Sequence, residues 1–202
     1  MAEATKTEQN LDELFKAGAH FGFGKSRRHP SVAPYIFGSK NRVDIFDLEK
    51  TQDSLNKALE LVSSLAATNS VILFVGGKNE AQEITKEAAE KINMPYLAGR
   101  WIGGTLTNFS EIRKRIDMML NLLSQKEKGE LAKYTKKERL LIDKKIEKLQ
   151  KMFWGIKDMA ALPKALFIID PRYEETALRE AKNLSIPVIA LCGSDNNVAN
   201  ID

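Results

Sequence analysis

Residues 71–75 read VILFV, an unbroken apolar run of the length of one strand. Residues 165–169 (ALFII) and 188–192 (VIALC) are runs of the same kind. Strands of a parallel sheet are usually covered on both faces, so they lack the alternation of polar and apolar residues seen in half-exposed strands. The three runs therefore predict strands of a parallel sheet.

Amphipathic stretches of helix length alternate with these runs, at residues 51–67, 79–92 and 174–184. Residues 43–46 (VDIF) and 96–97 add two further predicted strands. The alternation predicts an α/β fold with a doubly wound, mainly parallel sheet, of the Rossmann or flavodoxin-like three-layer type. Residues 1–10 are polar and are predicted to form a flexible tail.

Residues 109–157 break this alternation and predict an inserted antiparallel coiled-coil hairpin of two helices. Apolar residues recur at helical spacing in both halves of the segment: Ile112, Ile116, Met119, Leu123, and then Ile142, Ile146, Leu149, Phe153. Gly129 marks the reversal, and Thr135 with Glu138 has the spacing of a capping box. The insertion would divide the α/β domain into residues 11–108 and 158–202.

Positive charge is concentrated in two zones, although the whole chain of 202 residues carries only +4. Residues 16–42 contain six basic and no acidic residues, and residues 109–157 contain 14 basic against 7 acidic residues. These zones carry +13 together, which leaves −9 for the rest of the chain. Such asymmetry favours a face that binds phosphate, with a solvated, charge-laced helical pair as the alternative for the second zone.

Several classes of protein are excluded by the composition. The first residues lack the apolar core of a signal peptide, and no run approaches the roughly 20 apolar residues of a membrane span. Cys192 is the single cysteine and the histidines are only His20 and His29, so neither a disulfide nor a metal site is expected. No Ser or Cys nucleophile has a local catalytic signature, and no catalytic residue or cofactor is predicted.

Two loops have the residue types that bind phosphate. Lys25, Arg27 and Arg28 follow Gly22-Phe23-Gly24, and the planar guanidinium of Arg suits phosphate oxygens. Residues 99–108 (GRWIGGTLTN) place Arg beside Trp ahead of a predicted helix N-terminus. Trp101 would stack on a base there and Arg100 would bind phosphate; the alternative is that Trp101 is core packing and Asn108 an N-cap.

Gly76-Gly77-Lys78 follows a predicted strand and supports a second hypothesis, a nucleotide- or sugar-phosphate-binding enzyme. Neither GxxxxGK[ST] nor GxGxxG is present, so a tight turn is favoured over a phosphate loop. A third hypothesis is a protein-binding scaffold whose helical hairpin engages a partner helix.

The chain resembles the family of the second protein of the bacterial small ribosomal subunit, in motifs spread from about residue 11 to residue 190. They are residues 17–22 (AGAHFG), 33–38 (APYIFG), 47–51 (DLEKT), 73–76 (LFVG), 100–109 (RWIGGTLTNF), 155–159 (GIKDM) and 162–167 (LPKALF). The chain departs from the family pattern at Phe23, where the family has a histidine, and at Arg28-His29, where it has Trp-Asn.

This resemblance implies a non-catalytic structural protein that holds small-subunit ribosomal RNA and docks the messenger-RNA-binding ribosomal protein one. Neighbouring small-subunit proteins are further expected partners, whereas a membrane and a second copy of the chain are not. A cytoplasmic ribosome is the expected location, with an organellar ribosome as the alternative. The expected RNA-contact residues are Lys25, Arg27, Arg28, Arg100, Trp101, Thr107, Asn108, Arg113 and Lys114.

Overall fold

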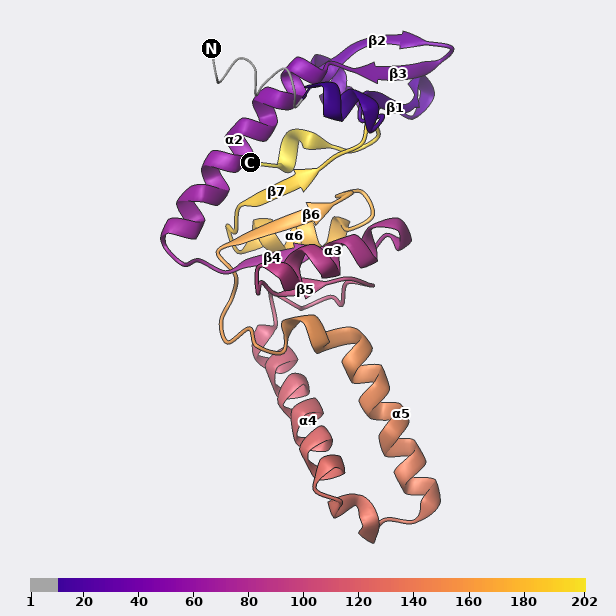
Figure 1. Cartoon of the computed structure of the whole chain (residues 1–202), viewed down its shortest axis with the longest axis vertical. Coiled ribbons are helices and arrows are strands. Elements are labelled where there is room, and N and C mark those ends of the chain that lie inside the picture. Colours follow the sequence, from indigo (N-terminus) through magenta and orange to yellow (C-terminus); the bar gives the residue numbers. More distant parts are fainter. Residues whose placement is uncertain (1–10) are drawn as a thin grey trace. The chain divides into compact units, whose positions relative to one another are not determined.

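A computed structural model describes residues 11–202, and the predicted tail at residues 1–10 lies outside the described residues. The chain forms two compact units, which are described separately below (Figure 1). Among the described residues, unit 1 comprises residues 11–70, Asp170–Arg172 and Ile189–Asp202, and unit 2 comprises Val71–Ile169 and Tyr173–Val188.

Unit 1 contains an antiparallel sheet of three strands in the order β1-β3-β2. The strands are β1 (Phe21–Gly24), β2 (Ile36–Lys40) and β3 (Val43–Phe46), and short 3-10 helices lie at η1 (Lys25–Arg27), η2 (Pro30–Tyr35) and η5 (Val198–Asn200). The long helix α2 (Leu48–Ala67) follows β3. It begins at Asp47, whose carboxylate accepts hydrogen bonds from the backbone N–H groups of Glu49 and Lys50.

The prediction that residues 43–46 belong to the parallel sheet is wrong. Strand β3 pairs antiparallel with both β1 and β2. The cause lies in the two residues between β2 and β3, because Asn41 and Arg42 have positive φ angles of 53° and 65°. Positive φ at both central residues gives the tight turn of a β-hairpin, so β3 folds back on the strand just before it.

The parallel sheet has four strands in the order β5-β4-β6-β7, and it confirms the predicted α/β fold. These strands are β4 (Ile72–Val75), β5 (Tyr96–Leu97), β6 (Ala165–Ile169) and β7 (Val188–Leu191). Strand β4 pairs in parallel with β5 on one side and β6 on the other. Helices α3 (Asn79–Lys91) and α6 (Glu175–Asn183) belong to unit 2. Leu73, Val75, Leu166 and Ile168 are fully buried, as expected for strands covered on both faces.

Helices α4 (Phe109–Glu127) and α5 (Lys136–Phe153) lie side by side in unit 2 (Figure 1). Their buried residues are Ile112, Ile116 and Met119 on α4 and Ile146, Leu149 and Phe153 on α5. Gly129, with φ of 72°, follows the end of α4, and the short helix η3 (Glu130–Lys133) comes next. The predicted capping box of Thr135 and Glu138 is confirmed at the start of α5.

A close approach of backbone to a neighbouring side chain fixes the end of α5. The short helix η4 (Trp154–Ile156) follows α5, and Gly155 within it lies against Tyr96 of β5. A Cβ atom on Gly155 would lie 2.7 Å from Cδ2 of Tyr96 and would overlap the carbonyl oxygen of the same residue. Only glycine therefore lets α5 end so close to the edge of the sheet.

We expect Gly155→Ala to lower the free energy of unfolding by about 2 kcal/mol, because the added methyl group displaces backbone rather than a flexible side chain. Urea unfolding followed by circular dichroism measures this loss. Gly103→Ala is the matched control, since a Cβ at Gly103 meets nothing within 4 Å. Equal stability of the two variants would contradict the assigned close contact.

Candidate nucleic-acid interface

The basic loop of unit 1 presents two accessible cations. Lys25 is exposed and has no ion-pair partner within residues 11–202. The Arg27 side chain is 59% exposed; its guanidinium carbon lies 4.7 Å from the centroid of the Phe23 ring, and Nη2 lies 3.8 Å from Oδ2 of Asp195. This contact is long, and the same oxygen of Asp195 pairs more closely with Arg172, at 2.6 Å, so both Lys25 and Arg27 remain available to an external anion.

Arg28 has a different environment from its two neighbours. Its Nε lies 3.7 Å from Oδ2 of Asp44, whose side chain is fully buried. The hydroxyl of Ser39 donates a hydrogen bond of 2.5 Å to the other oxygen of Asp44. A buried carboxylate without a counter-charge is strongly destabilising, so Arg28 stabilises unit 1 by neutralising Asp44.

In unit 2, the loop between β5 and α4 wraps around one carboxylate. The indole Nε1 of Trp101 donates to Oε1 of Glu180 (3.1 Å), and so does the backbone N–H of Gly104 (2.7 Å). The other oxygen, Oε2, accepts from the backbone N–H groups of Leu106 (2.9 Å) and Thr107 (3.2 Å). Much of the loop that the sequence predicted to contact RNA therefore binds an internal carboxylate instead.

Glu180 remains ionised although it is buried, with 7% of its surface exposed. Burial raises the pKa of Glu180, but hydrogen bonds from Trp101, Gly104, Leu106 and Thr107 outweigh that effect and hold the pKa below its ordinary value. Trp101 itself is only 7% exposed. Its position in this structure suits packing rather than base stacking, and it shapes the loop that presents Arg100.

A second internal carboxylate occupies the turn after β4. The backbone N–H of Gly77 donates to Oε1 of Glu174 (3.0 Å), and Glu174 is 3% exposed. A Cβ atom on Gly77 would overlap that oxygen. Because Glu174 takes the place in which a nucleotide-binding turn holds phosphate, the main support for the enzyme hypothesis is lost.

The other predicted contact residues lie at or near the start of α4. Arg113 donates from Nη1 to the carbonyl oxygens of Lys157 (2.8 Å) and Met159 (3.3 Å), so it ties α4 to the segment after α5. Lys114 is 72% exposed and pairs with Glu111 at 2.6 Å, an exchangeable surface contact. Asn108 occupies the N-cap position but makes no side-chain cap hydrogen bond. Arg100 is exposed, with no carboxylate partner in the described part of the chain.

Sequence reasoning missed Glu174 and Glu180, because both lie on or beside α6, far along the chain from the loops that they hold. Gly77 and Glu174 are 97 residues apart, and no local pattern links them. The cations were predicted from charge and, for Lys25, Arg27 and Arg100, also from motifs, and neither signal shows whether a cation already has an internal partner. Arg28 and Arg113 have such partners, whereas Lys25 and Arg100 have no ion-pair partner among the described residues.

The described residues contain neither a candidate metal site nor a candidate membrane span. No three His, Cys, Asp or Glu side chains between residues 11 and 202 are grouped so that they could hold a metal ion. In the same range, every helix is too short or too polar to cross a membrane. Burial, and then the charge of Asp170, raise the pKa of Cys192 to about 12, so this thiol stays protonated and unreactive at neutral pH.

Comparison with known proteins identifies relatives along nearly the whole chain. The family model described as Ribosomal protein S2 matches residues 14–202. A small ribosomal subunit protein uS2 of Psychrobacter cryohalolentis is 42% identical over 202 residues, which cover 100% of this chain and 76% of the relative. The protein of the same name from Hahella chejuensis is 43% identical over 196 residues (97% and 78%), and that from Chloroflexus aurantiacus is 41% identical over 202 residues (100% and 85%).

We expect Glu180→Gln to lower the free energy of unfolding by about 2–3 kcal/mol at pH 7, because an amide replaces a charged acceptor of buried donors. The pKa of Glu180 is lower in the folded chain than in the unfolded chain. The stabilisation is therefore present above the ordinary value of 4.5 and is lost as the pH falls through the lowered value. Urea unfolding of both proteins at several pH values measures whether their difference shrinks in that window.

Glu175→Gln on the same helix is the control for this prediction. The Glu175 side chain is 72% exposed and pairs with Arg179 only at the surface. We expect its substitution to change stability by less than about 0.5 kcal/mol. A difference between wild type and Glu180→Gln that does not vary with pH would exclude the charged state assigned to Glu180.

Proposed function

Because the chain belongs to the ribosomal protein S2 family, we propose that it binds small-subunit ribosomal RNA through exposed cations on both of its units. The family consists of structural, non-enzymatic proteins of the small ribosomal subunit that serve translation. Its bacterial members imply a location on cytoplasmic ribosomes. The RNA-binding role is the step that goes beyond this membership.

The observation that carries the RNA proposal is the exposure of Lys25 and Arg100 without an ion-pair partner among the described residues. A phosphate can bind such side chains without first displacing a carboxylate, and it releases condensed counterions when it does. Arg27, whose contact with Asp195 is long, and Lys114, whose pair with Glu111 is exposed, join them as direct contacts. The remaining predicted residues with internal partners would support RNA binding indirectly, by holding the backbone that carries these cations. They are Arg28, Trp101, Thr107 and Arg113.

The proposal also concerns the architecture of the chain. Residues 109–157 would form an antiparallel coiled-coil hairpin inserted into a doubly wound α/β domain of residues 11–108 and 158–202. The buried residues along α4 and α5 support this arrangement, as does the surface ion pair of 2.6 Å between Lys126 and Asp143. The net charge of +7 on this segment favours RNA over solvent as its environment.

A second role, docking of ribosomal protein one, is supported by an aromatic surface in unit 1. Phe37 on β2 is 80% exposed, and with Phe15 and Phe46 it lines a hollow of about 390 Å³. Exposed aromatic side chains grouped in this way are typical of protein-docking surfaces. We propose that the chain acts there as a single copy, bound to other small-subunit proteins rather than to itself.

Replacing Lys25 and Arg27 together by Ala should reduce incorporation into small subunits several-fold, because two phosphate contacts are lost. Sedimentation of a cell lysate through a sucrose gradient, with the chain detected in each fraction, measures the incorporation. Arg28 is kept intact, since its removal would leave Asp44 without its counter-charge. Lys57→Ala combined with Lys91→Ala is the control, as both lysines are exposed and lie outside the basic zones.

The position of the wild-type chain in the same gradient tests the proposal that the chain binds ribosomal RNA. Recovery only in slow fractions that lack RNA would overturn RNA binding altogether. Normal incorporation of the Lys25 and Arg27 variant would remove this loop from the contact surface and leave the role of unit 2 to be tested separately.

Replacing Phe37 by Ala should weaken binding of purified ribosomal protein one by about tenfold, because a large aromatic contact is lost. Binding is measured by surface plasmon resonance after nuclease treatment, so that no RNA bridges the two proteins. The fold is expected to persist, since Phe37 is mostly exposed. Leu59→Ala is the control, because Leu59 is a 55% exposed apolar residue of α2 outside the hollow. Equal binding by both variants would place the docking surface elsewhere.

A further inference from the structure

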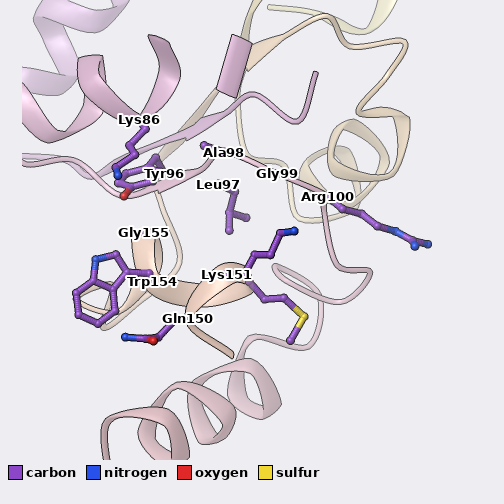
Figure 2. A pocket seen from close by; sticks show the side chains of 11 residues that line it. Lys86, Tyr96, Leu97, Ala98, Gly99, Arg100, Gln150, Lys151, Trp154 and Gly155 are labelled. Atoms are coloured by element: carbon purple, nitrogen blue, oxygen red, sulfur yellow. The ribbon is translucent and has the colours of Figure 1, made fainter. Parts of the chain in front are cut away.

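Unit 2 contains a hollow of about 390 Å³ between α3, β5 and the end of α5 (Figure 2). Its side-chain lining includes Lys86, Tyr96, Arg100, Gln150, Lys151 and Trp154. Residues 97–99, Met152 and Gly155 also line it. The hollow lies within the size range of roughly 300–1,000 Å³ that is typical of small-ligand sites.

All charged residues that line this hollow are basic. Lys86, Arg100 and Lys151 are exposed, and no carboxylate lines the hollow with them. None of the three has an ion-pair partner in the described part of the chain, whereas Lys114 and Lys126 on the neighbouring helix do. Glu90 accepts a hydrogen bond from the Tyr96 hydroxyl (2.8 Å) and does not line the hollow. Three uncompensated cations around one concave surface attract an anion.

Trp154 adds an aromatic surface to these cations. It is 40% exposed, in contrast to the buried Trp101, and Nζ of Lys157 lies 4.0 Å from the centroid of its ring. The contact of Gly155 with Tyr96 fixes the backbone that carries Trp154. Figure 2 shows Trp154 on one side of the hollow, Lys86 close to Tyr96, and Arg100 extending away from them.

We propose that this hollow binds one nucleotide of single-stranded RNA, with its base stacked on Trp154 and its phosphate bound by Lys86 and Lys151. Proteins that bind single strands combine cations for the backbone with aromatic rings for the bases, and this hollow has both. An acidic peptide would satisfy the cations but would leave the indole without a planar partner. The inference rests on the proposed RNA-binding function and extends it from Arg100, which also lines the hollow, to Lys86, Lys151 and Trp154, which lie outside the two basic loops.

The test uses the full chain and a short dye-labelled oligoadenylate, whose binding is followed by fluorescence anisotropy. We expect Lys86→Ala combined with Lys151→Ala to raise Kd about tenfold and to reduce the slope of log Kd against log salt by about 1.4, the value for two lost phosphate contacts on a single strand. Lys91→Ala combined with Lys144→Ala is the matched control, with one exposed lysine from each of the same two helices.

The stacking contact has its own readout. Binding of unlabelled oligoadenylate should quench the fluorescence of Trp154, and Trp154→Ala should both abolish that quenching and raise Kd about fivefold or more. Trp101 is buried and serves as the internal reference, while unchanged circular dichroism confirms that each variant is folded.

The remaining outcomes distinguish failure of the assigned site from failure of the proposed RNA binding. Equal Kd and equal salt slope for the hollow variant and its control overturn the assigned site, and RNA binding through the basic loops survives. Absence of oligoadenylate binding by a chain that still joins small subunits also overturns the site alone. Absence from small subunits overturns the proposed function with it. Stronger quenching of Trp154 by an oligoglutamate peptide than by oligoadenylate would show that a protein segment occupies the hollow.

Discussion

The carboxylate of Glu180 is the interaction on which the organisation of unit 2 depends. It accepts hydrogen bonds from Trp101, Gly104, Leu106 and Thr107, and thereby fixes the whole loop that connects β5 with α4. A loop with so many inward-facing N–H groups would otherwise leave buried donors unsatisfied, at a cost of about 1–3 kcal/mol each. Because α4 starts directly after this loop, the position of α4, and of α5 packed beside it, depends on a single charged group of α6.

The parallel sheet was predictable and the antiparallel sheet was not, for a physical reason. The strands around Leu73, Leu166 and Val188 are largely buried, so their sequences are continuous apolar runs that stand out from the chain. Strands β1 and β2 are short and partly exposed and are interrupted by glycine, and they give no such signal. The hairpin turn at Asn41 and Arg42 was also hidden, because a positive φ is usually associated with glycine, and Arg rarely adopts it.

The candidate site was only partly predictable, because a sequence shows which charges exist but not which of them are already paired. Composition placed Arg28 and Arg113 among the phosphate contacts, yet both already have partners within the chain. Arg28 pairs with Asp44, and Arg113 donates hydrogen bonds to carbonyl oxygens after α5. The sequence did not single out Lys86 and Lys151, because they lie on different helices and line the same hollow only in the folded unit. The exposure of Trp154 and the burial of Trp101 likewise depend on packing, and neither can be read from residue type.

These assignments separate two kinds of positive group in unit 2. Backbone N–H donors, which are rigid and directional, already donate hydrogen bonds to the internal carboxylates of Glu174 and Glu180. The cations that remain unpaired, such as Arg100, stand at the ends of long, flexible side chains. Such side chains can follow phosphates at variable positions but cannot fix the edge of a base, because base reading requires donors held at defined angles. The proposed RNA binding would therefore depend on the shape and charge of the RNA, as is general for RNA recognition, rather than on a particular base sequence.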